Sequence, residues 1–180
     1  MIELDYIINQ FSKVKVNKMK PVIRNILRMS VYQLKYMDSV PDSAVCNEAV
    51  KLAKRKGFGS LSGFVNGVLR NISRNLSSIT YPDGQKDQIQ YLSVRYSMPE
   101  WIVRQWINDY GMERTVSVLQ AFLQEAPVTI RTNLLKITPE ALEMRLKEEG
   151  VTTEKIVCAD MPELNYAFVT VSYTHLTLPT

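Results

Sequence analysis

With 180 residues, of which 46% are hydrophobic and 22% charged, the chain has the composition of an ordinary globular protein and can form one domain or two small ones. It contains no apolar run of the ~18 residues that cross a bilayer, and its first residues do not resemble a secretory signal, so the sequence predicts a cytoplasmic protein without a membrane partner. Cys46 and Cys158 form no CxxC pair, which favours two reduced, buried thiols over a disulfide or a metal site.

The net charge of +4 conceals an uneven distribution. Residues 11–75 contain thirteen lysines and arginines against three acidic residues, a local net charge of +10, and the rest of the chain carries −6. A basic half beside an acidic half indicates that one half meets a polyanion, and RNA or DNA is the first candidate.

Three helices are predicted in the basic half. The first covers residues 21–37, begins at Pro21 and ends before Val40-Pro41. The second covers residues 43–56 and is followed by Gly57, a residue that favours helix ends. The third covers residues 60–76. Their apolar side chains recur every three or four residues, as on one face of a helix: Ile23, Ile26, Leu27, Ser30, Leu34 and Met37; Val45, Ala49, Leu52 and Ala53; Leu61, Phe64, Val65, Val68, Leu69, Ile72 and Leu76.

Further helices are predicted after the turn signal at residues 81–84. One contains Ile89 and Leu92. The next begins with a capping box from Ser97 to Glu100 and ends at Gly111, and a last one ends before Pro127.

After residue 127 the pattern changes to strands at 128–134, 155–159 and 166–171, with a short helix from residue 138 to about residue 150. The predicted fold class is therefore mainly α, with a helical bundle followed by a small βαββ-like α+β segment.

Residues 172–180 differ in composition from the rest of the chain, since threonine, leucine, proline and the single histidine occur there without the charges seen elsewhere. Two interpretations stay open: a short exposed edge strand or a non-native tail.

The sequence shows little that could carry catalysis. His175 has no partner residue nearby in the sequence, no metal-ligand cluster is present, and no glycine-rich loop matches a phosphate or dinucleotide fingerprint. Glu48 lacks a nearby carboxylate or histidine, so a structural role is favoured. Trp101 and Trp106 could stack on bases, but packing in a core or an interface is favoured.

The basic side chains are the best candidates for a site. The predicted RNA-binding residues are Arg24, Arg28, Lys51, Lys54, Arg55, Lys56, Arg70 and Arg74. Arg24 and Arg28, like Arg70 and Arg74, are four residues apart, so each pair lies on one side of its helix. A solvated surface alone would explain each pair, but the concentration of charge favours one basic face that binds nucleic acid.

Two stretches resemble the helical fold of the antitermination factor NusB. These are Arg24-Asn-Ile-Leu-Arg-Met-Ser-Val-Tyr-Gln-Leu34, and the ordered pair Asn47-Glu-Ala-Val50 and Phe64-Val-Asn-Gly-Val-Leu-Arg70. The segments Tyr96-Ser-Met-Pro-Glu-Trp101 and Ala126-Pro-Val-Thr-Ile-Arg-Thr-Asn133 are similar to the RsmB (Sun/Fmu) family of 16S ribosomal-RNA cytosine-C5 methyltransferases. Free-standing NusB proteins are expected to end before the segments at residues 96–101 and 126–133.

The resemblance implies a domain order: residues 1–80 a partial NusB-like RNA-binding domain, 81–126 a helical linker, 127–171 the start of an α/β domain, and 172–180 the tail, which does not continue the family pattern. Family members carry further N-terminal helix, so we expect the apolar faces of the first and third predicted helices to be partly uncovered and to self-associate. The catalytic cysteine and the S-adenosylmethionine domain are expected beyond residue 180.

The function implied is RNA binding within a 16S ribosomal-RNA (cytosine-C5) methyltransferase. Its cofactor is S-adenosylmethionine in the full-length parent and none in this fragment, which is predicted to be inactive alone and to bind small-subunit ribosomal RNA without a metal. The alternatives are a stand-alone NusB-type antitermination module and an all-α protein-interaction domain.

Overall fold

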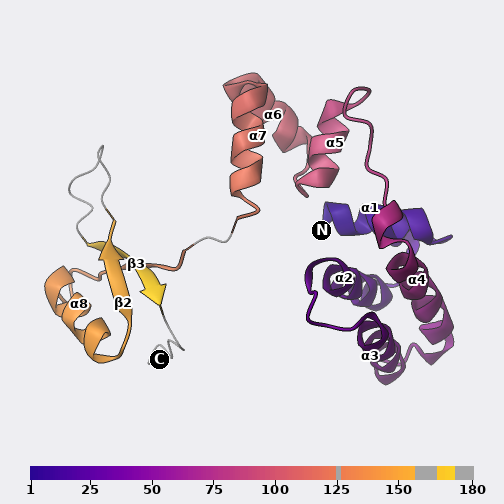
Figure 1. Cartoon of the computed structure of the whole chain (residues 1–180), viewed down its shortest axis with the longest axis horizontal. Helices are drawn as coiled ribbons and strands as arrows, with labels where there is room; N and C mark the ends of the chain where they lie inside the picture. The colour runs from indigo at the N-terminus through magenta and orange to yellow at the C-terminus, as the bar shows by residue number, and fades with distance from the viewer. Residues whose placement is uncertain (125–126, 157–165, 173–180) are drawn as a thin grey trace. The chain divides into compact units, whose positions relative to one another are not determined.

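The structure is a computed structural model that describes residues 1–124, 127–156 and 166–172, with two compact units, Met1–Leu123 and Gln124–Thr180 (Figure 1). The predicted boundaries near residues 80 and 126 stay predictions. None of the described helices has the length and apolarity needed to span a membrane.

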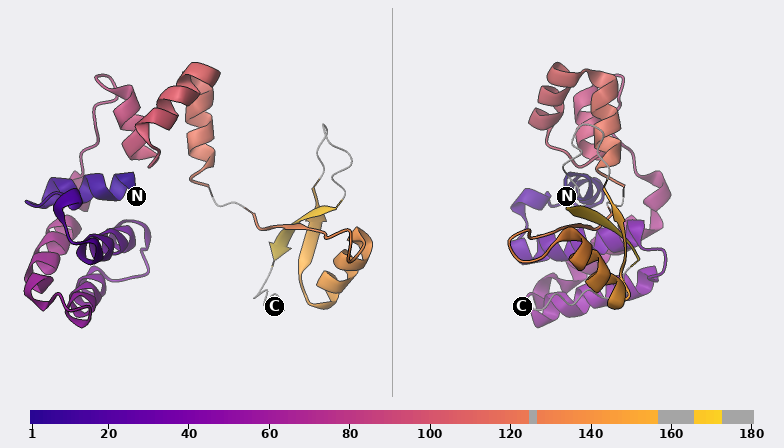
Figure 2. Two further views of the ribbon diagram at one scale, coloured as in Figure 1. Left: turned by 180° about the vertical axis from the view of Figure 1, so that it is seen from behind. Right: turned by 90° about the vertical axis from the view of Figure 1, so that its left-hand side faces the viewer.

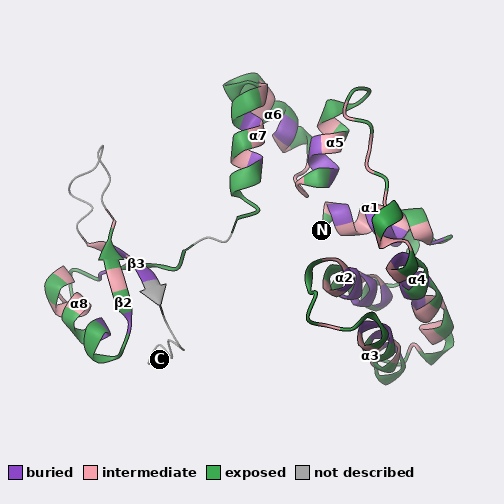
Figure 3. Cartoon of the chain, viewed as in Figure 1, coloured by how far each residue is buried: buried purple, intermediate pink, exposed green. Residues whose placement is uncertain are grey.

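A bundle of four helices forms the first part of the first unit: α1 (Ile2–Phe11), α2 (Pro21–Tyr36), α3 (Asp42–Arg55) and α4 (Ser62–Arg74). Short 3₁₀ turns at Val16–Lys18, Gly59–Leu61 and Leu76–Ser78 lie between or after them. The buried side chains lie on the inner faces of the helices, as the purple segments of Figure 3 show. They include Ile7, Ile8, Ile23, Leu27, Val31, Val45, Ala49, Ala53, Val65, Leu69 and Ile72.

The apolar spacing in the sequence predicted α2, α3 and α4 to within two residues at each end. Pro21 occupies the first turn of α2, where its missing N–H costs nothing. Gly57 follows α3 with a φ of 84°, in the left-handed region that only glycine adopts without strain. Met37 is an exception: it follows α2 as its C-cap and is 39% exposed, so it does not belong to the buried stripe.

Residues 2–11, for which no element was predicted, form α1. Ile7 and Ile8 of α1 are fully buried in the core that α2, α3 and α4 share. The expectation of partly uncovered apolar faces on α2 and α4 is therefore wrong, because α1 covers them: Leu27 and Leu69 are both 0% exposed.

Three helices complete the first unit: α5 (Gln88–Arg95), α6 (Glu100–Tyr110) and α7 (Met112–Ala121). They surround a smaller core of Leu92, Val103 and Leu119, and Figure 2 shows this group from behind and from the side. Gly111 separates α6 from α7 with a φ of 78°, as predicted for a helix-ending glycine.

The predicted capping box at Ser97 is wrong. Helix α6 begins at Glu100 with Pro99 as its N-cap and without a side-chain cap. Ser97 instead has a φ of 52°, and its Oγ accepts a hydrogen bond from the Glu3 backbone N–H of α1 at 3.2 Å. The Ser97 hydroxyl therefore accepts from α1 and does not cap the N-terminus of α6.

The two tryptophans of α6 differ in their surroundings. Trp106 packs on the small core and stacks on Phe122, with ring centroids 5.9 Å apart and an interplanar angle of 16°. Trp101 is 67% exposed. Among the described residues, the predicted packing of both tryptophans in a core therefore applies to Trp106 and not to Trp101.

The second unit contains β1 (Thr129–Arg131), α8 (Pro139–Glu148), β2 (Thr152–Lys155) and β3 (Ala167–Ser172). β3 is the central strand and pairs antiparallel with both neighbours, so the sheet order is β1-β3-β2. Phe168 of β3 lies opposite Ile130 and Lys155 and is fully buried. The order strand, helix, strand, strand agrees with the predicted α+β segment.

Two strand boundaries needed correction. The strand predicted at 155–159 begins earlier, at Thr152, and residues 157–159 lie outside the described residues, as do Cys158, His175 and residues 173–180. The strand predicted at 128–134 ends at Arg131 because Asn133 forms a turn, in which its Oδ1 accepts from the Leu135 N–H at 3.1 Å.

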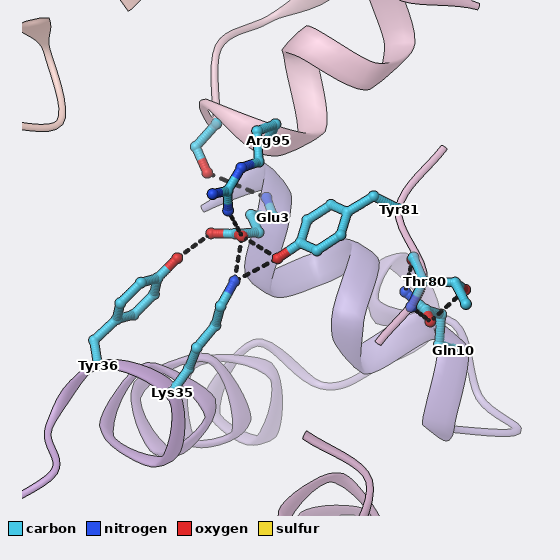
Figure 4. Close-up of polar contacts among 8 residues, drawn as sticks. Glu3, Gln10, Lys35, Tyr36, Thr80, Tyr81 and Arg95 are labelled. Carbon is cyan, nitrogen blue, oxygen red and sulfur yellow. Dashed lines mark hydrogen bonds and ion pairs between the residues drawn. The ribbon is translucent and has the colours of Figure 1, made fainter. Parts of the chain in front are cut away.

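A buried carboxylate joins α1 to three other parts of the first unit, which are α2, the segment that contains Tyr81, and α5 (Figure 4). Glu3 is 5% exposed and accepts hydrogen bonds from Lys35 and Tyr36 of α2, and from Tyr81 at 2.6 Å. The guanidinium of Arg95 from α5 lies 4.0 Å from the same carboxylate. The segment that follows α4 also contacts the C-terminal end of α1. The Gln10 side-chain amide donates to the Thr80 carbonyl and accepts from the Thr80 backbone N–H.

The electrostatics of this cluster favour its charged form. Burial opposes ionisation of Glu3, but hydrogen bonds from Lys35, Tyr36 and Tyr81 outweigh it and lower the pKa of Glu3 below its ordinary 4.5. Burial likewise opposes protonation of Lys35, but the hydrogen bond to Glu3 and those to Tyr81 and Tyr36 raise the pKa of Lys35 to about 12. Glu3 and Lys35 therefore form an ion pair at neutral pH.

Replacing Leu27 by alanine should destabilise the first unit by about 2–5 kcal/mol, because the side chain is fully buried and leaves a cavity. The matched variant Leu123→Ala removes the same atoms from a side chain that is 61% exposed and should change stability by less than about 0.5 kcal/mol. Chemical denaturation followed by the helical circular-dichroism signal measures both. Equal losses in the two variants would contradict the assignment of this core.

Replacing Glu3 by glutamine should destabilise the first unit by about 1.5–3 kcal/mol, because Lys35 loses a charged hydrogen-bond partner. The contribution of the ionised Glu3 is complete above pH 4.5 and is lost as the pH falls through the lowered pKa of the folded state. The contribution of protonated Lys35 is complete below pH 10.5 and is lost as the pH rises through about 12.

Unfolding free energies measured from pH 7 down to pH 3 test this, since wild type should lose stability more steeply than Glu3→Gln. The control Glu48→Gln removes an exposed pair with Lys51 and should cost at most about 0.5 kcal/mol. Parallel pH profiles for wild type and Glu3→Gln would show that the carboxylate contributes nothing.

Candidate nucleic-acid interface

Arg28 of α2 faces α1 and already has a partner there. Its Nε and Nη2 donate to the two carboxylate oxygens of Asp5 at 2.6 and 2.5 Å, and this hydrogen bonding raises the pKa of Arg28. The Nε of Arg24 is buried and has no hydrogen-bond partner among the described residues. Arg28 therefore connects α1 to α2, which is a structural role that the sequence did not predict.

A groove between α2 and α3 contains three of the predicted basic residues. It consists of two adjoining depressions of about 420 and 260 Å³ that share Met29 and Leu52 as their floor. Lys51 and Arg55 line the larger depression and Lys56 the smaller one. We call this feature the α2–α3 groove. Its remaining lining residues are Val22, Asn25, Ile26, Ser30, Gln33, Glu48 and Ala49.

The charges on the α2–α3 groove are mostly positive. Its single carboxylate, Glu48, is neutralised by Lys51 at 2.7 Å. Arg55 and Lys56 are exposed and have no ion-pair partner among the described residues. The groove therefore combines an apolar floor with cations at its edge.

A separate depression of about 320 Å³ lies between α3 and α4 and contains Arg70 and Arg74. It is also lined by Asp42, Ser43, Cys46 and Ser73. Asp42 accepts a hydrogen bond from the Ser73 hydroxyl at 2.5 Å. Cys46 is 3% exposed, and burial raises the pKa of its thiol, which agrees with the prediction of a reduced, buried residue.

The structure thus does not gather the eight predicted residues on one face. Lys51, Arg55 and Lys56 border the α2–α3 groove, Arg70 and Arg74 border the α3–α4 depression, and Arg28 is bound to Asp5. Lys54 is exposed and lines neither of these depressions. Sequence spacing placed each pair correctly on its own helix, but it could not show which neighbour each helix side would meet.

Three further side chains on the outer surface of α2 were not among the predicted residues. Met29, Tyr32 and Tyr36 are 48%, 51% and 48% exposed. Their spacing of three and four residues, offset from the buried stripe, was the signal that could have identified them as a second apolar line on the same helix.

The described residues contain no cluster of three histidine, cysteine, aspartate or glutamate side chains that could hold a metal. They also show no cradle for a nucleotide cofactor, since Gly57, Gly59, Gly63 and Gly67 lie in a loop and in helical segments rather than between a strand and a helix.

Comparison with known protein families gives two matches. Residues 1–74 match the NusB family, and residues 98–162 match the family described as "Methyltr_RsmF/B-like, ferredoxin-like domain". Both parts of the resemblance predicted from the sequence are confirmed.

Individual proteins agree with these matches. The chain is 36% identical over 154 residues to the probable ribosomal RNA small subunit methyltransferase B of Bacillus subtilis. This alignment covers 86% of this chain and 34% of that protein. It is 42% identical over 79 residues to the transcription antitermination protein NusB of Acidothermus cellulolyticus, covering 43% and 54% of the two chains.

The crystal structure of PH0851 is similar with a TM-score of 0.70 and 18% identity, over 95% of this chain and 37% of that one, which shows a shared fold. The chain spans about a third of the length of the curated methyltransferases that it matches. Residues 1–74 are therefore similar to the NusB family, and residues 98–162 are similar to the ferredoxin-like domain of the RsmF/B-like methyltransferases.

Proposed function

We propose that this chain is the RNA-binding region of an S-adenosylmethionine-dependent methyltransferase that modifies C5 of a cytosine in 16S ribosomal RNA in the cytoplasm. The observation that carries the proposal is the order of the two family matches, a NusB-family bundle followed within 24 residues by a ferredoxin-like domain of the RsmF/B type. The methyltransferase relative spans both parts, since it aligns over 86% of the chain.

A stand-alone antitermination module is the second candidate, and the alignments favour it less. The NusB relatives align over at most 43% of the chain, so they leave α5, α6, α7 and the whole second unit without a counterpart. The methyltransferase relatives account for most of these residues.

The role proposed for the basic residues of α3 and α4 is to bind RNA. Exposed cations at the α2–α3 groove and the α3–α4 depression can neutralise backbone phosphates, and release of counterions then drives association. Such contacts fix the position and orientation of an RNA without reading its sequence. S-adenosylmethionine would supply the methyl group in the parent enzyme, but the described residues do not fit that cofactor.

Replacing both Arg70 and Arg74 by alanine should weaken binding to fragments of 16S ribosomal RNA at low salt. Each lost phosphate contact should reduce the slope of log affinity against log salt by up to about one unit, with no change in sequence preference. Fluorescence anisotropy across a salt series measures both quantities. The matched variant Arg104→Ala/Arg114→Ala removes the same charge from the exposed surfaces of α6 and α7 and should retain the wild-type slope.

The isolated chain should show no methyl transfer and no measurable affinity for S-adenosylmethionine, because its glycines are not placed to hold the cofactor. Isothermal titration calorimetry with S-adenosylmethionine checks the affinity, and transfer of a radiolabelled methyl group to 16S ribosomal RNA checks the activity. Micromolar cofactor binding would contradict the assignment of a purely RNA-binding role to this chain.

A further inference from the structure

The outer surface of α2 exposes an apolar and aromatic line that the bundle does not use. Met29, Tyr32 and Tyr36 are each about half exposed, although their neighbours Leu27, Val31 and Leu34 are buried. Because the three exposed residues are three and four positions apart, their side chains lie one above another along the helix.

Polar contacts fix the Tyr36 ring, and the Tyr32 ring packs against it. The Tyr36 hydroxyl donates to the Glu3 carboxylate, and the Lys35 ammonium lies 5.0 Å from the centre of the Tyr36 ring (Figure 4). Tyr32 packs on Tyr36 with ring centroids 5.1 Å apart and an interplanar angle of 43°. The Tyr32 hydroxyl has no hydrogen-bond partner among the described residues, so no polar contact there has to be broken to cover its ring.

The charges around these rings suit an anionic ligand. Three acids on α1 and α3 are already paired with cations: Glu3 with Lys35, Asp5 with Arg28, and Glu48 with Lys51. Met29 connects the two tyrosines to the α2–α3 groove, because it lies on the α2 surface beside Tyr32 and also forms the floor of both depressions. Arg55 and Lys56 stand at the other side of that groove.

We propose that Tyr32 and Tyr36 form a stacking platform for an unpaired RNA base, with the flanking phosphates held along the α2–α3 groove by Arg55 and Lys56. The proposal rests on the proposed RNA-binding function and adds the structural class of RNA, a single-stranded segment. Aromatic rings stack on the face of any base, whereas the bases of a duplex have both faces covered by their neighbours.

Two other observations favour RNA over a protein partner at this surface. Aromatic faces beside exposed cations are the combination used for single strands, in which rings stack on bases and cations follow the phosphates. The groove also has no unpaired acid that would match a basic peptide, since its only carboxylate is bound to Lys51. An acidic amphipathic peptide is the remaining protein ligand, and the experiment below includes it.

The test compares wild type with Tyr32→Ala in fluorescence anisotropy with four labelled probes. Three are RNA: a twelve-nucleotide single strand of mixed sequence, a strand of the same length with abasic sites, and a duplex. The fourth is a glutamate-rich helical peptide. Tyr32→Ala should bind the single strand roughly 5- to 150-fold more weakly, the effect of one lost stacking contact. Binding to the abasic strand and the duplex should be unchanged. The slope of log affinity against log salt should also be unchanged, because stacking releases no counterions.

Two further variants separate the ring from its surroundings. Tyr32→Phe keeps the ring and should bind like wild type. Tyr110→Ala removes an equally exposed tyrosine, 55% accessible on α6, and should have no effect. Because Tyr32 is exposed, all three variants should keep the wild-type helical signal, which circular dichroism checks.

Wild-type affinity of Tyr32→Ala for the single strand would overturn the proposal while leaving the proposed RNA-binding function intact. An equal loss on the abasic strand would overturn it as well, since the ring would then act without a base. Failure of the wild-type chain to bind any of the RNA probes would refute both proposals. If Tyr32→Ala instead loses only binding to the glutamate-rich helical peptide, the surface is a protein site.

Discussion

The first unit depends on one buried carboxylate. Glu3 lies near the start of α1, where it receives hydrogen bonds from α2 and from Tyr81 and lies 4.0 Å from Arg95 of α5. Its backbone N–H donates to Ser97, just before α6. A charge buried in this way is costly unless several partners compensate it, so the cluster forms only when all of these segments are in place. This requirement connects the four-helix bundle to the three helices that follow it, although each group has its own apolar core.

The same cluster affects the outer surface of the bundle. By accepting from the Tyr36 hydroxyl and holding Lys35 under the ring, Glu3 fixes an aromatic side chain that remains half exposed. Asp5, two residues further along α1, binds Arg28 and so removes one cation from the set available to a ligand. Polar contacts of α1 therefore determine which polar side chains of α2 are used in contacts between helices and which remain accessible to a ligand.

The distribution of cations has a consequence for how an RNA could be held. Basic residues border two depressions on different sides of α3, and α2 adds exposed aromatic rings beside one of them. Contacts spread over separate surfaces suit a folded RNA that follows the bundle better than a straight duplex along one face. Phosphate contacts of this kind would determine the position and orientation of a bound RNA without reading its sequence.

The sequence by itself determined α2, α3 and α4, the change to strands after residue 127, and the resemblance to the NusB family, because apolar periodicity and the motifs Asn47–Val50 and Phe64–Arg70 are local properties of the chain. It left α1 unassigned, although Leu4, Ile7, Ile8 and Phe11 recur at helical spacing. The partner of Ser97 could not be predicted, because Glu3 lies 94 positions away in the sequence. The eight basic residues were predicted to form one face, and their role in binding RNA stays a prediction. Only the tertiary structure decided that Arg28 pairs with Asp5 and that α3 separates Arg55 from Arg70, since the neighbour that each side of a helix meets is set by the packing of the whole bundle.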